Sequence, residues 1–215
     1  MKLEGQAVLA LWNDTAVELD EEYNAWHSTE HVPERLTVPG IVRARRYKNA
    51  DDATYPYFTL YELLDLDVLE SAPYRTLIEH PTPWSRRMRT KFTNMKRVPA
   101  SNRVSQGEPV GERIVTLMCE LDAGVSEEEL VSYLTATEGV CATHLGKASV
   151  ETGSIAWRDC AETENEAYVL LVELESGFEK DKECLVVEDR LTKFGAAKNI
   201  IVQCYKLLEI LNEIK

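Results

Sequence analysis

The sequence predicts an α+β protein built from two copies of one order of elements: strand, helix, strand, strand, helix, strand. Three observations support this prediction. Short apolar or β-branched runs alternate with stretches of helical periodicity along the 215 residues. A polar, turn-rich passage divides the chain near its middle. Beyond that passage the pattern of the first half starts again, as expected for an internal repeat.

The first three elements follow from apolar patterning and from turn residues. Gln6 to Trp12 is a short apolar run that predicts a buried strand. Val17 to about Val32 has the periodicity of an amphipathic helix. Pro39-Gly40 then turns the chain into a third element, the strand Ile41 to Tyr47.

The rest of the first half completes a recognised order. Tyr57 to Leu64 is rich in aromatic and β-favouring residues and predicts an antiparallel strand. A second helix is predicted from Asp67 to about Ile78. The two prolines of His80 to Trp84 predict an extended, rigid passage, and Arg86 to Val98 is interpreted as a helix end followed by the fourth strand. This β-α-β-β-α-β series is the ferredoxin-like order.

The passage Ser101 to Gly111 is the predicted linker, because polar and turn-forming residues dominate it. The division is placed between residues 104 and 105. A first half, 1–104, would therefore carry the site, and a diverged second half, 105–215, would repeat its fold.

Two stretches of the second half match the first in register. Gly111 to Met118 has the apolar placement of Gly5 to Trp12, and Tyr168 to Leu174 shares Tyr, Leu, Glu and Leu with Tyr57 to Leu63. Ser126 followed by Glu129 predicts a helix start with a capping box. Further on, a helix is predicted from residues 181 to 194. A strand is predicted from 200 to 208, with a far end that could instead be helical.

The duplication has a geometric consequence. Two four-stranded antiparallel sheets, each with helices on one face, can pack their other faces together or close at their edges into a barrel. One chain would then contain its own pseudo-dimer.

The charge balance limits the classes of partner. With 24 Lys+Arg against 37 Asp+Glu, the formal net charge is -13, which disfavours nucleic acid and anionic membranes as partners. The basic segment Arg86 to Arg97 is interleaved with apolar residues, so we interpret it as a pocket wall rather than a phosphate-binding patch. The expected partner is a small molecule, and a homodimer is an arrangement open to the chain.

The cysteines and the N-terminus favour the cytoplasm. The five cysteines are odd in number, widely spaced and lack a Cys-x-x-Cys pair, which argues against a disulfide framework and a structural zinc site. Cys119 is predicted to be a buried structural thiol. The apolar run near the N-terminus is too short for a membrane span and lacks a signal-peptide cleavage pattern.

A polar stripe on the first helix is the candidate site. Tyr23, His27, His31 and Arg35 recur at every fourth position, so they lie on one helical face, which Trp26 flanks. Pro33 disfavours helical geometry at the residue before it, so we expect the regular helix to bend or stop close to His31 and to place the stripe near an opening. The alternative interpretation is a solvated polar face.

These residues suggest proton transfer. His31 would abstract or donate the proton, His27 or Glu30 would orient it or act as its partner, and Arg35 or Arg46 would stabilise negative charge on an enolate or phenolate. A carboxylate beside the imidazole would raise the imidazole pKa. The alternative is that the carboxylates and guanidinium groups form surface ion pairs of little energetic value.

Aromatic residues are candidates for contacting a substrate. Tyr23, Tyr61, Tyr74 and Trp84 could line an aromatic pocket, although aromatics at such spacings often belong to the core. Trp84 is the strongest of these candidates, because it follows two prolines in a segment predicted to be irregular. The predicted substrate-binding set is Tyr23, Arg46, Tyr61 and Trp84.

The same histidine pair also matches a zinc-protease pattern. His27 to His31 reads H-x-x-E-H, in which two histidines bind zinc and the glutamate acts as a base. Against this, Pro33 interrupts the helix, and no downstream helix offers an evident third carboxylate ligand. We therefore expect neither a metal nor another cofactor, and a looser divalent or haem-iron role for one histidine stays open.

Several of these residues together resemble a known family. The run Trp26-His27-x-x-Glu30-His31-x-Pro33-Glu34-Arg35, then Val38-Pro39-Gly40 with Ala44-Arg45-Arg46-Tyr47, and Tyr61-Glu62-Leu63, is similar to the EthD-like branch of the dimeric α+β barrel superfamily. The resemblance covers about residues 7 to 97, and the second half only in its order of elements. It implies duplicated ferredoxin-like halves that form an intrachain barrel, a pocket between sheet and helices, and His31 as the family's histidine.

The resemblance leaves the reaction open, since the superfamily includes cofactor-free monooxygenases, dehydratases, decarboxylases, lactone isomerases and haem enzymes. The expected function is cofactor-independent dehydration, isomerisation or decarboxylation of an aromatic or enolisable compound. The alternatives are a non-catalytic ligand-binding barrel and a cofactor-free or haem-dependent monooxygenase. The second half carries Tyr133, Thr137 and Glu138 where the first has its histidine pair, so one site per chain is expected.

Overall fold

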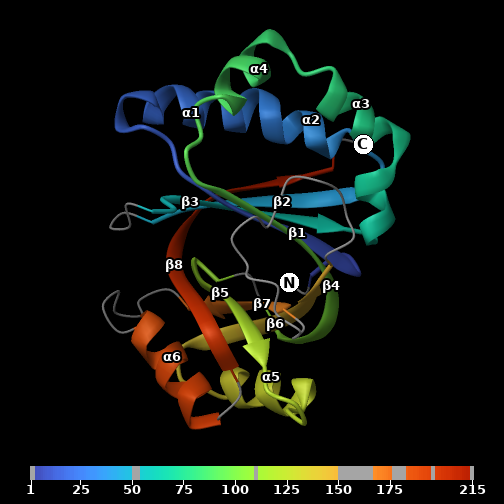
Figure 1. Ribbon diagram of the computed structural model, residues 1–215. Helices are drawn as coiled ribbons and strands as arrows, with labels where there is room; N and C mark the ends of the chain where they lie inside the picture. The colour runs from blue at the N-terminus through green and yellow to red at the C-terminus, as the bar shows by residue number, and fades with distance from the viewer. Residues whose placement is uncertain are drawn as a thin grey trace.

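The computed structural model describes residues 3–49, 54–108, 111–149, 167–175, 183–194 and 197–213. Its strands close into one antiparallel barrel in the order β1-β3-β2-β8-β5-β7-β6-β4 (Figure 1). The strands are β1 (Ala7–Asn13), β2 (Ile41–Lys48), β3 (Tyr57–Leu63), β4 (Met95–Gly107), β5 (Arg113–Leu121), β6 (Val140–Ala148), β7 (Ala167–Leu174) and β8 (Ala197–Asn212). The predicted α+β fold class with duplicated halves is confirmed.

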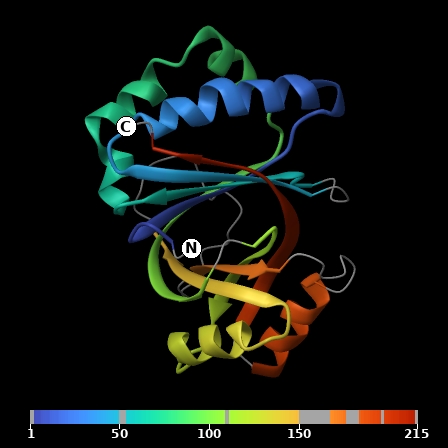
Figure 2. The same ribbon diagram turned by 180° about the vertical axis from the view of Figure 1, so that it is seen from behind.

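Helical segments cover two opposite sides of this barrel. Those of the first half lie against one side and those of the second half against the other (Figures 1 and 2). They are η1 (Val17–Leu19), α1 (Asp20–Trp26), the π-helical turn η2 (His27–His31), α2 (Val32–Leu36), η3 (Leu66–Glu70), α3 (Ala72–Glu79), α4 (Pro83–Arg89), α5 (Glu127–Thr135) and α6 (Glu183–Phe194). Among the described residues, no helix is long and apolar enough to cross a membrane.

The two halves are joined by exchanging their longest strands. β4 belongs to the first half but continues onto β6, where Ser105 lies opposite His144. β8 belongs to the second half and pairs with β2, where Ile210 lies opposite Arg45. These two pairings cover the sheet edges that either half alone would expose. Of the two arrangements left open by the sequence, the structure has the closed barrel.

The predicted linker is therefore mostly strand. Residues 101–107 form the far part of β4, and their backbone pairs with β6. A polar composition is compatible with this strand because none of residues 101–107 is buried, so the backbone pairs with β6 without apolar side chains. The division at residues 104 and 105 falls inside this strand.

Two other predictions about elements need correction, and an alternative left open is settled. Of the predicted bend or stop near His31, the stop is wrong, because the helix changes to π-helical winding at His27–His31 and continues through Pro33 to Leu36. The passage His80–Trp84 is not wholly extended, because Pro83 begins α4, and Thr82 caps that helix by accepting a hydrogen bond from the Ser85 amide. The end of β8 is strand to Asn212 rather than helix, since its backbone pairs with β2.

Other local predictions are confirmed. Gly40 has a φ of +95°, which the turn after Pro39 requires and which a residue with a Cβ rarely adopts. The Ser126 side chain caps α5 by accepting a hydrogen bond from the Glu129 amide. Cys119 is buried, and burial raises the pKa of its thiol to about 12, as expected for an unreactive thiol. Cys160 and the Cys184 side chain lie outside the described residues.

Strand alternation separates an inner from an outer face. The barrel interior holds the apolar cluster of Trp12, Tyr47, Phe58, Leu60 and their neighbours. The intervening residues of the same strands face the helices, in two clusters in the first half and one in the second. A side chain's parity along its strand thus decides whether it enters the barrel or faces the helices.

The barrel interior also contains a network of buried ions. Glu62 accepts hydrogen bonds from Arg43 Nε at 2.8 Å and Nη2 at 2.7 Å. Arg45 lies 3.0 Å from Glu62 through Nε and 2.6 Å from Glu173 of the second half through Nη1. His144 Nε2 lies 3.2 Å from the same oxygen of Glu173. The two glutamates occupy the matching positions of the sequence repeat, and Arg45 joins them.

We predict that Glu173→Ala lowers the free energy of unfolding by about 3–5 kcal/mol, because it leaves the buried Arg45 charge without one of its two partners. Urea denaturation measures this change. The matched control is Glu70→Ala, which breaks an exposed ion pair with Arg75 and should cost at most about 1 kcal/mol. Equal losses in the two variants would contradict a stabilising role for the network.

Candidate functional site

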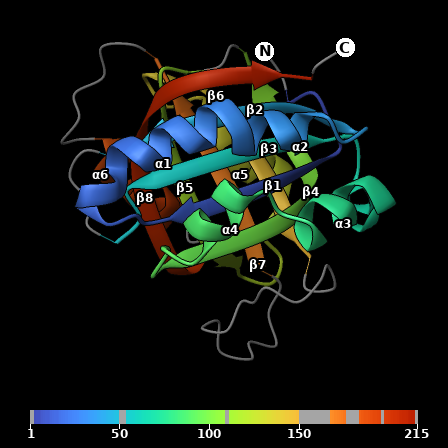
Figure 3. The ribbon, with the colours of Figure 1, turned by 90° about the horizontal axis from the view of Figure 1, so that it is seen from above.

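The helix that carries the predicted stripe changes its winding within the stripe. Asp20 to Leu36 is continuously helical and lies across the sheet as one run in the view from above (Figure 3), and the five residues His27–His31 form a π-helical turn between α1 and α2. Pro33 is the second residue of α2, so its missing amide falls in the first turn after the helical hydrogen-bond register changes. The helix therefore passes through the proline, and Arg35 stays on the run that holds the two histidines.

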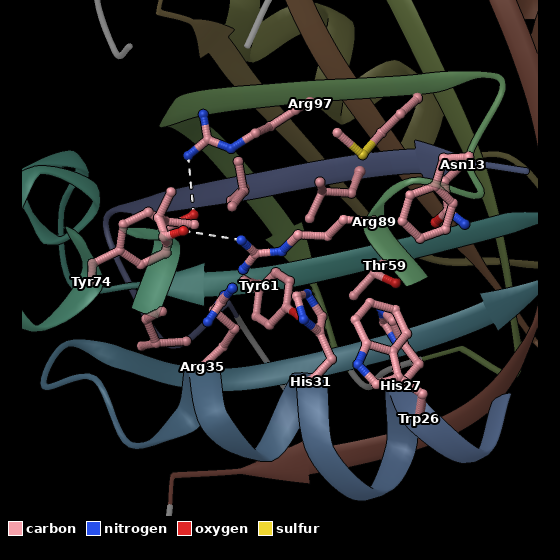
Figure 4. Close-up of a pocket in the computed structure, with 16 residues that line it drawn as sticks. Asn13, Trp26, His27, His31, Arg35, Thr59, Tyr61, Tyr74, Arg89 and Arg97 are labelled. Atoms are coloured by element: carbon pink, nitrogen blue, oxygen red, sulfur yellow. Dashed lines mark hydrogen bonds between the residues drawn. The ribbon is translucent and has the colours of Figure 1, made fainter. Parts of the chain in front are cut away.

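A cavity of about 310 Å³ lies between this helix, α3, α4 and the outer face of the sheet (Figure 4). Its volume is at the lower end of the range typical of small-molecule sites. The lining is Leu9, Leu11, Asn13, Trp26, His27, His31, Arg35, Ile41, Thr59, Tyr61, Tyr74, Ile78, Arg89, Phe92, Met95 and Arg97. The location agrees with the pocket that the family resemblance implied.

Four polar atoms of this lining are buried and have no hydrogen-bond partner in the protein: His27 Nδ1, His31 Nδ1, Arg35 Nη1 and Tyr61 Oη. The histidines and Arg35 project from the helix toward the sheet, and Tyr61 comes from β3 (Figure 4). Buried polar atoms are almost always satisfied in folded proteins. Four exceptions on one cavity indicate a place where a ligand supplies the missing partners.

The rings along the helix form a contiguous row. The ring centroids of His27 and His31 are 5.2 Å apart, and Trp26 lies 4.4 Å from His31. Tyr23 packs behind His27 at 5.1 Å. This packing restricts the orientation of both imidazoles, as a site for positioned proton transfer requires.

Burial and positive neighbours keep both imidazoles neutral. Burial, followed by the charges of Arg46, His31 and Arg35, lowers the pKa of His27 well below 6.5. Burial, followed by Arg35 and Arg89, does the same to His31. The expectation that a carboxylate would raise the imidazole pKa is therefore wrong. Burial also raises the pKa of Tyr61, so the phenol keeps its proton and can donate it.

Glu30 has a different role from the one predicted. Its Oε1 accepts hydrogen bonds from Thr82 Oγ1 at 2.6 Å and from Ser85 Oγ at 3.1 Å. Trp26 Nε1 donates to the same Ser85 Oγ. Glu30 does not line the cavity, and its carboxylate ties α4 to the first helix instead of orienting an imidazole.

Of the predicted substrate-binding residues, Tyr61 lines the cavity, and the other three lie outside its lining. Tyr23 is buried and donates to Asn13 Oδ1 at 3.2 Å. Arg46 forms an ion pair with Glu209 and donates to Asn24. Trp84 lies in the first turn of α4 and donates to Glu22.

No sequence pattern singles out Arg89 or Arg97 individually, although both line the cavity. They belong to the basic segment Arg86–Arg97, which was predicted to be a pocket wall and contributes Arg89, Phe92, Met95 and Arg97 to the lining. The sequence therefore predicts that this segment lines a pocket, but it does not predict which of its residues point inward. Choosing the inward residues required the end of α4 and the register of β4, neither of which the sequence defined.

The histidine pair does not fit the zinc-protease pattern. The carboxylate of Glu30 is committed to Thr82 and Ser85. No cluster of three or more potential metal ligands occurs among the described side chains. The charges of Arg35 and Arg89 act on His31 and would also repel a divalent cation.

The second half fills the equivalent space with apolar side chains. In the register of the repeat, the positions of Asn13, Thr59 and Tyr61 are taken by Cys119, Leu170 and Val172, which belong to the apolar cluster beneath α5 and α6. His144 lies on β6 and bonds to Ser105 and Glu173. The cavity lined by the histidine pair therefore belongs to the first half.

Comparisons with known proteins locate the fold. No family model matches the chain, and no curated protein matches its sequence. Among solved structures, an anthrone oxidase-like protein is similar with a TM-score of 0.64 and 10% identity, over 100% of this chain and 97% of that one. A candidate monooxygenase from Fusobacterium nucleatum subsp. nucleatum gives 0.58 and 9%, over 98% and 96%. A candidate monooxygenase from Lactobacillus acidophilus gives 0.54 and 12%, over 96% of each chain.

This likeness concerns the fold. It extends over nearly the whole length of the chains compared, so both halves of the barrel take part. Identities near 10% give no basis for transferring a reaction, since one fold supports many functions. The chemistry has to be inferred from the cavity.

The neutral histidines predict an acid-sensitive fold. A group whose folded-state pKa lies below its unfolded value of 6.5 contributes a loss of stability as the pH falls below 6.5. For His27, which is 5% exposed, the loss approaches about 1.4 kcal/mol per pH unit until its folded-state pKa is reached. His27→Asn should reduce the difference in unfolding free energy between pH 7 and pH 5.5.

The control is His80→Asn, because His80 is exposed after the end of α3, and its removal should leave that difference unchanged. An unchanged slope between pH 7 and 5.5 in His27→Asn would contradict a buried neutral imidazole.

Glu173 affects stability in a separate, more acidic pH range. Burial acts to raise the pKa of Glu173, but Arg45 and His144 outweigh it and lower the pKa to about 2. The stability that Glu173 contributes is therefore lost only as the pH falls below 4.5.

Proposed function

We propose that the chain is a small-molecule enzyme that abstracts a proton from an aromatic or enolisable substrate in the first-half cavity, without a cofactor. One observation carries the proposal: His27 Nδ1, His31 Nδ1, Arg35 Nη1 and Tyr61 Oη are buried around a mainly apolar cavity without protein partners. The grouping of these four atoms on one lining favours a ligand site over a purely structural helix face. The EthD-like motif, which includes His31, supports the same assignment.

His31 is the proposed base. It lies between His27 and Arg35 along the helix, and its side chain points into the cavity (Figure 4). A neutral imidazole has a lone pair available to accept a substrate proton at neutral pH. The C–H bond breaks, its electron pair stays on the substrate carbon, and the proton moves to the imidazole.

Tyr61 and Arg35 are the proposed stabilisers of the resulting enolate or phenolate. Tyr61 is protonated and donates through Oη, and Arg35 is positive and offers Nη1. Both act from a desolvated site, where a fixed donor stabilises developing negative charge more strongly than water does. The anion would also favour the imidazolium that forms on His31.

The fate of the carbanion separates the possible reactions. Expulsion of hydroxide, which leaves as water after taking a proton, gives dehydration, and reprotonation at another atom gives isomerisation. Decarboxylation would instead begin with the loss of CO₂ from a substrate carboxylate, and an imidazolium would protonate the carbanion that remains. The second candidate function is cofactor-free monooxygenation, which the names of the structural neighbours favour. There the carbanion would reduce oxygen, and for anthrone the balanced reaction is anthrone plus O₂ giving anthraquinone plus water. Both candidates begin with the same proton abstraction.

The test uses anthrone and phenylpyruvate as enolisable aromatic probes. Anaerobic exchange of their acidic C–H protons in D₂O, followed by NMR, reports proton abstraction alone. We expect the wild type to accelerate exchange of at least one probe, and His31→Ala to lower that rate by about 10²–10⁴-fold, the usual contribution of a general base. In air, oxygen consumption with anthrone would identify the monooxygenase branch.

His80→Ala is the matched control, because it removes an exposed histidine and should leave the exchange rate unchanged. Because the low pKa of His31 keeps its imidazole neutral in the free enzyme, the exchange rate should be constant from pH 8 to 6.5. It should fall only at lower pH, where the imidazole becomes protonated. Full activity in His31→Ala would exclude His31 as the base. Saturable binding of both probes with no exchange would favour a non-catalytic binding protein.

A further inference from the structure

The four buried arginines among the described residues, together with the half-buried Arg89 and Arg97, fall into two groups. Arg43, Arg45 and Arg46 are 2% exposed or less, and each forms an ion pair with a glutamate. This is the usual state of a buried cation, because an unpaired charge away from water is costly. The cavity arginines can be compared with these three on one property, whether each forms an ion pair.

The cavity arginines have no such partner. Arg35, Arg89 and Arg97 line the cavity, and within the described part of the chain none of them forms an ion pair. Arg35 is 4% exposed, and its Nη1 lacks any hydrogen-bond partner. The charge of Glu34 acts on Arg35 and Arg89, but Glu34 does not line the cavity.

The neutral neighbours of these arginines hold them in place without cancelling their charge. Arg97 Nη2 donates to Tyr74 Oη at 3.3 Å, and Arg89 Nη1 donates to the Ile78 carbonyl at 3.1 Å. The guanidinium carbon of Arg35 lies 5.8 Å from the centre of the Tyr74 ring. Figure 4 shows Arg35 and Arg89 directed toward each other from opposite sides of the cavity. Among the residues that the structure describes, no aspartate or glutamate belongs to the lining.

The cavity is also polarised along its length. His27, His31 and Arg35 follow one another at intervals of four residues, so the cationic end lies about 6 Å, one helical step of four residues, beyond His31. The opposite end is formed by His27 and Trp26 (Figure 4), and the lining residue Phe92 has its ring centroid 6.3 Å from that of Trp26. A ligand lying along this axis would meet guanidinium groups at one end, an imidazole in the middle and aromatic rings at the other.

We propose that the ligand is an aromatic carboxylate whose carboxylate binds Arg35 and Arg89, with Arg97 adding charge, and whose rings occupy the end formed by Trp26 and Phe92. This inference rests on the proposed function for the site and specifies its substrate class. Guanidinium groups bind carboxylates through paired N–H donors, which would satisfy Arg35 Nη1. The carboxylate serves as an anchor, and the reacting carbon lies over His31. With Arg35 Nη1 bound to the carboxylate, Tyr61 Oη is the hydrogen-bond donor to the enolate, and Arg35 stabilises that enolate through its charge alone.

The experiment compares ligands that differ only in charge. Benzoate, 2-naphthoate and anthracene-2-carboxylate are each titrated by calorimetry into the full-length wild type beside the corresponding neutral amide. At least one carboxylate should bind ten times or more as tightly as its amide, and the preference should weaken with added salt. These probes have no enolisable C–H, so the result is independent of turnover and separates failure of this inference from failure of the proposed reaction.

Charge-removing variants locate the anchor. Arg89→Gln, which changes a half-buried side chain, should abolish the preference for the carboxylate, and Arg35→Gln should do the same. Arg75→Gln is the matched control, because Arg75 is exposed on α3 and pairs with Glu70 outside the cavity. The inference is overturned if no carboxylate binds more tightly than its amide in the wild type, or if the preference survives in folded Arg89→Gln protein.

Discussion

The ion network around Arg45 is the interaction on which the arrangement of the molecule depends. Arg45 Nε lies 3.0 Å from Glu62, and its Nη1 lies 2.6 Å from Glu173, so one guanidinium group joins the two halves inside the barrel. Because side chains alternate along a strand, a slip of one residue in β2 would expel Arg45 from the barrel and bring Arg46 inside. The same register that pairs Arg45 internally therefore sends Arg46 toward the helices, where it bonds to Asn24.

The contrast between paired and unpaired cations connects this scaffold to the cavity. Inside the barrel, each arginine has its carboxylate, whereas the cavity places Arg35 and Arg89 beside two neutral imidazoles and a protonated phenol without an acidic residue in the lining. A protein of net charge -13 does not lack carboxylates. Their exclusion from this one lining is consistent with a site that takes its negative charge from a ligand, either as a bound carboxylate or as an enolate formed during reaction.

Much of this could be predicted from sequence, because the informative patterns were local or repeated. The order of elements, the duplication and the stripe of His27, His31 and Arg35 follow from periodicity alone. The continuation of the helix past Pro33 could not be predicted, since it depends on a π-helical turn, and neither could the orientation of Glu30, which depends on the position of α4. The ion pairs of Arg45 with Glu62 and Glu173 join residues that are distant in sequence, so they could be assigned only once the register of the barrel strands was known.

The most direct test of the central claim is an NMR pH titration of the histidine ring protons, with His27 and His31 assigned by single substitutions. The electrostatics of the cavity predict that both titrate well below 6.5 in the free protein, and that saturating 2-naphthoate moves the His31 titration upward as the carboxylate offsets the charges of Arg35 and Arg89. Titration of both histidines near 6.5, with no response to 2-naphthoate, would contradict a desolvated cationic cavity built to receive an anion.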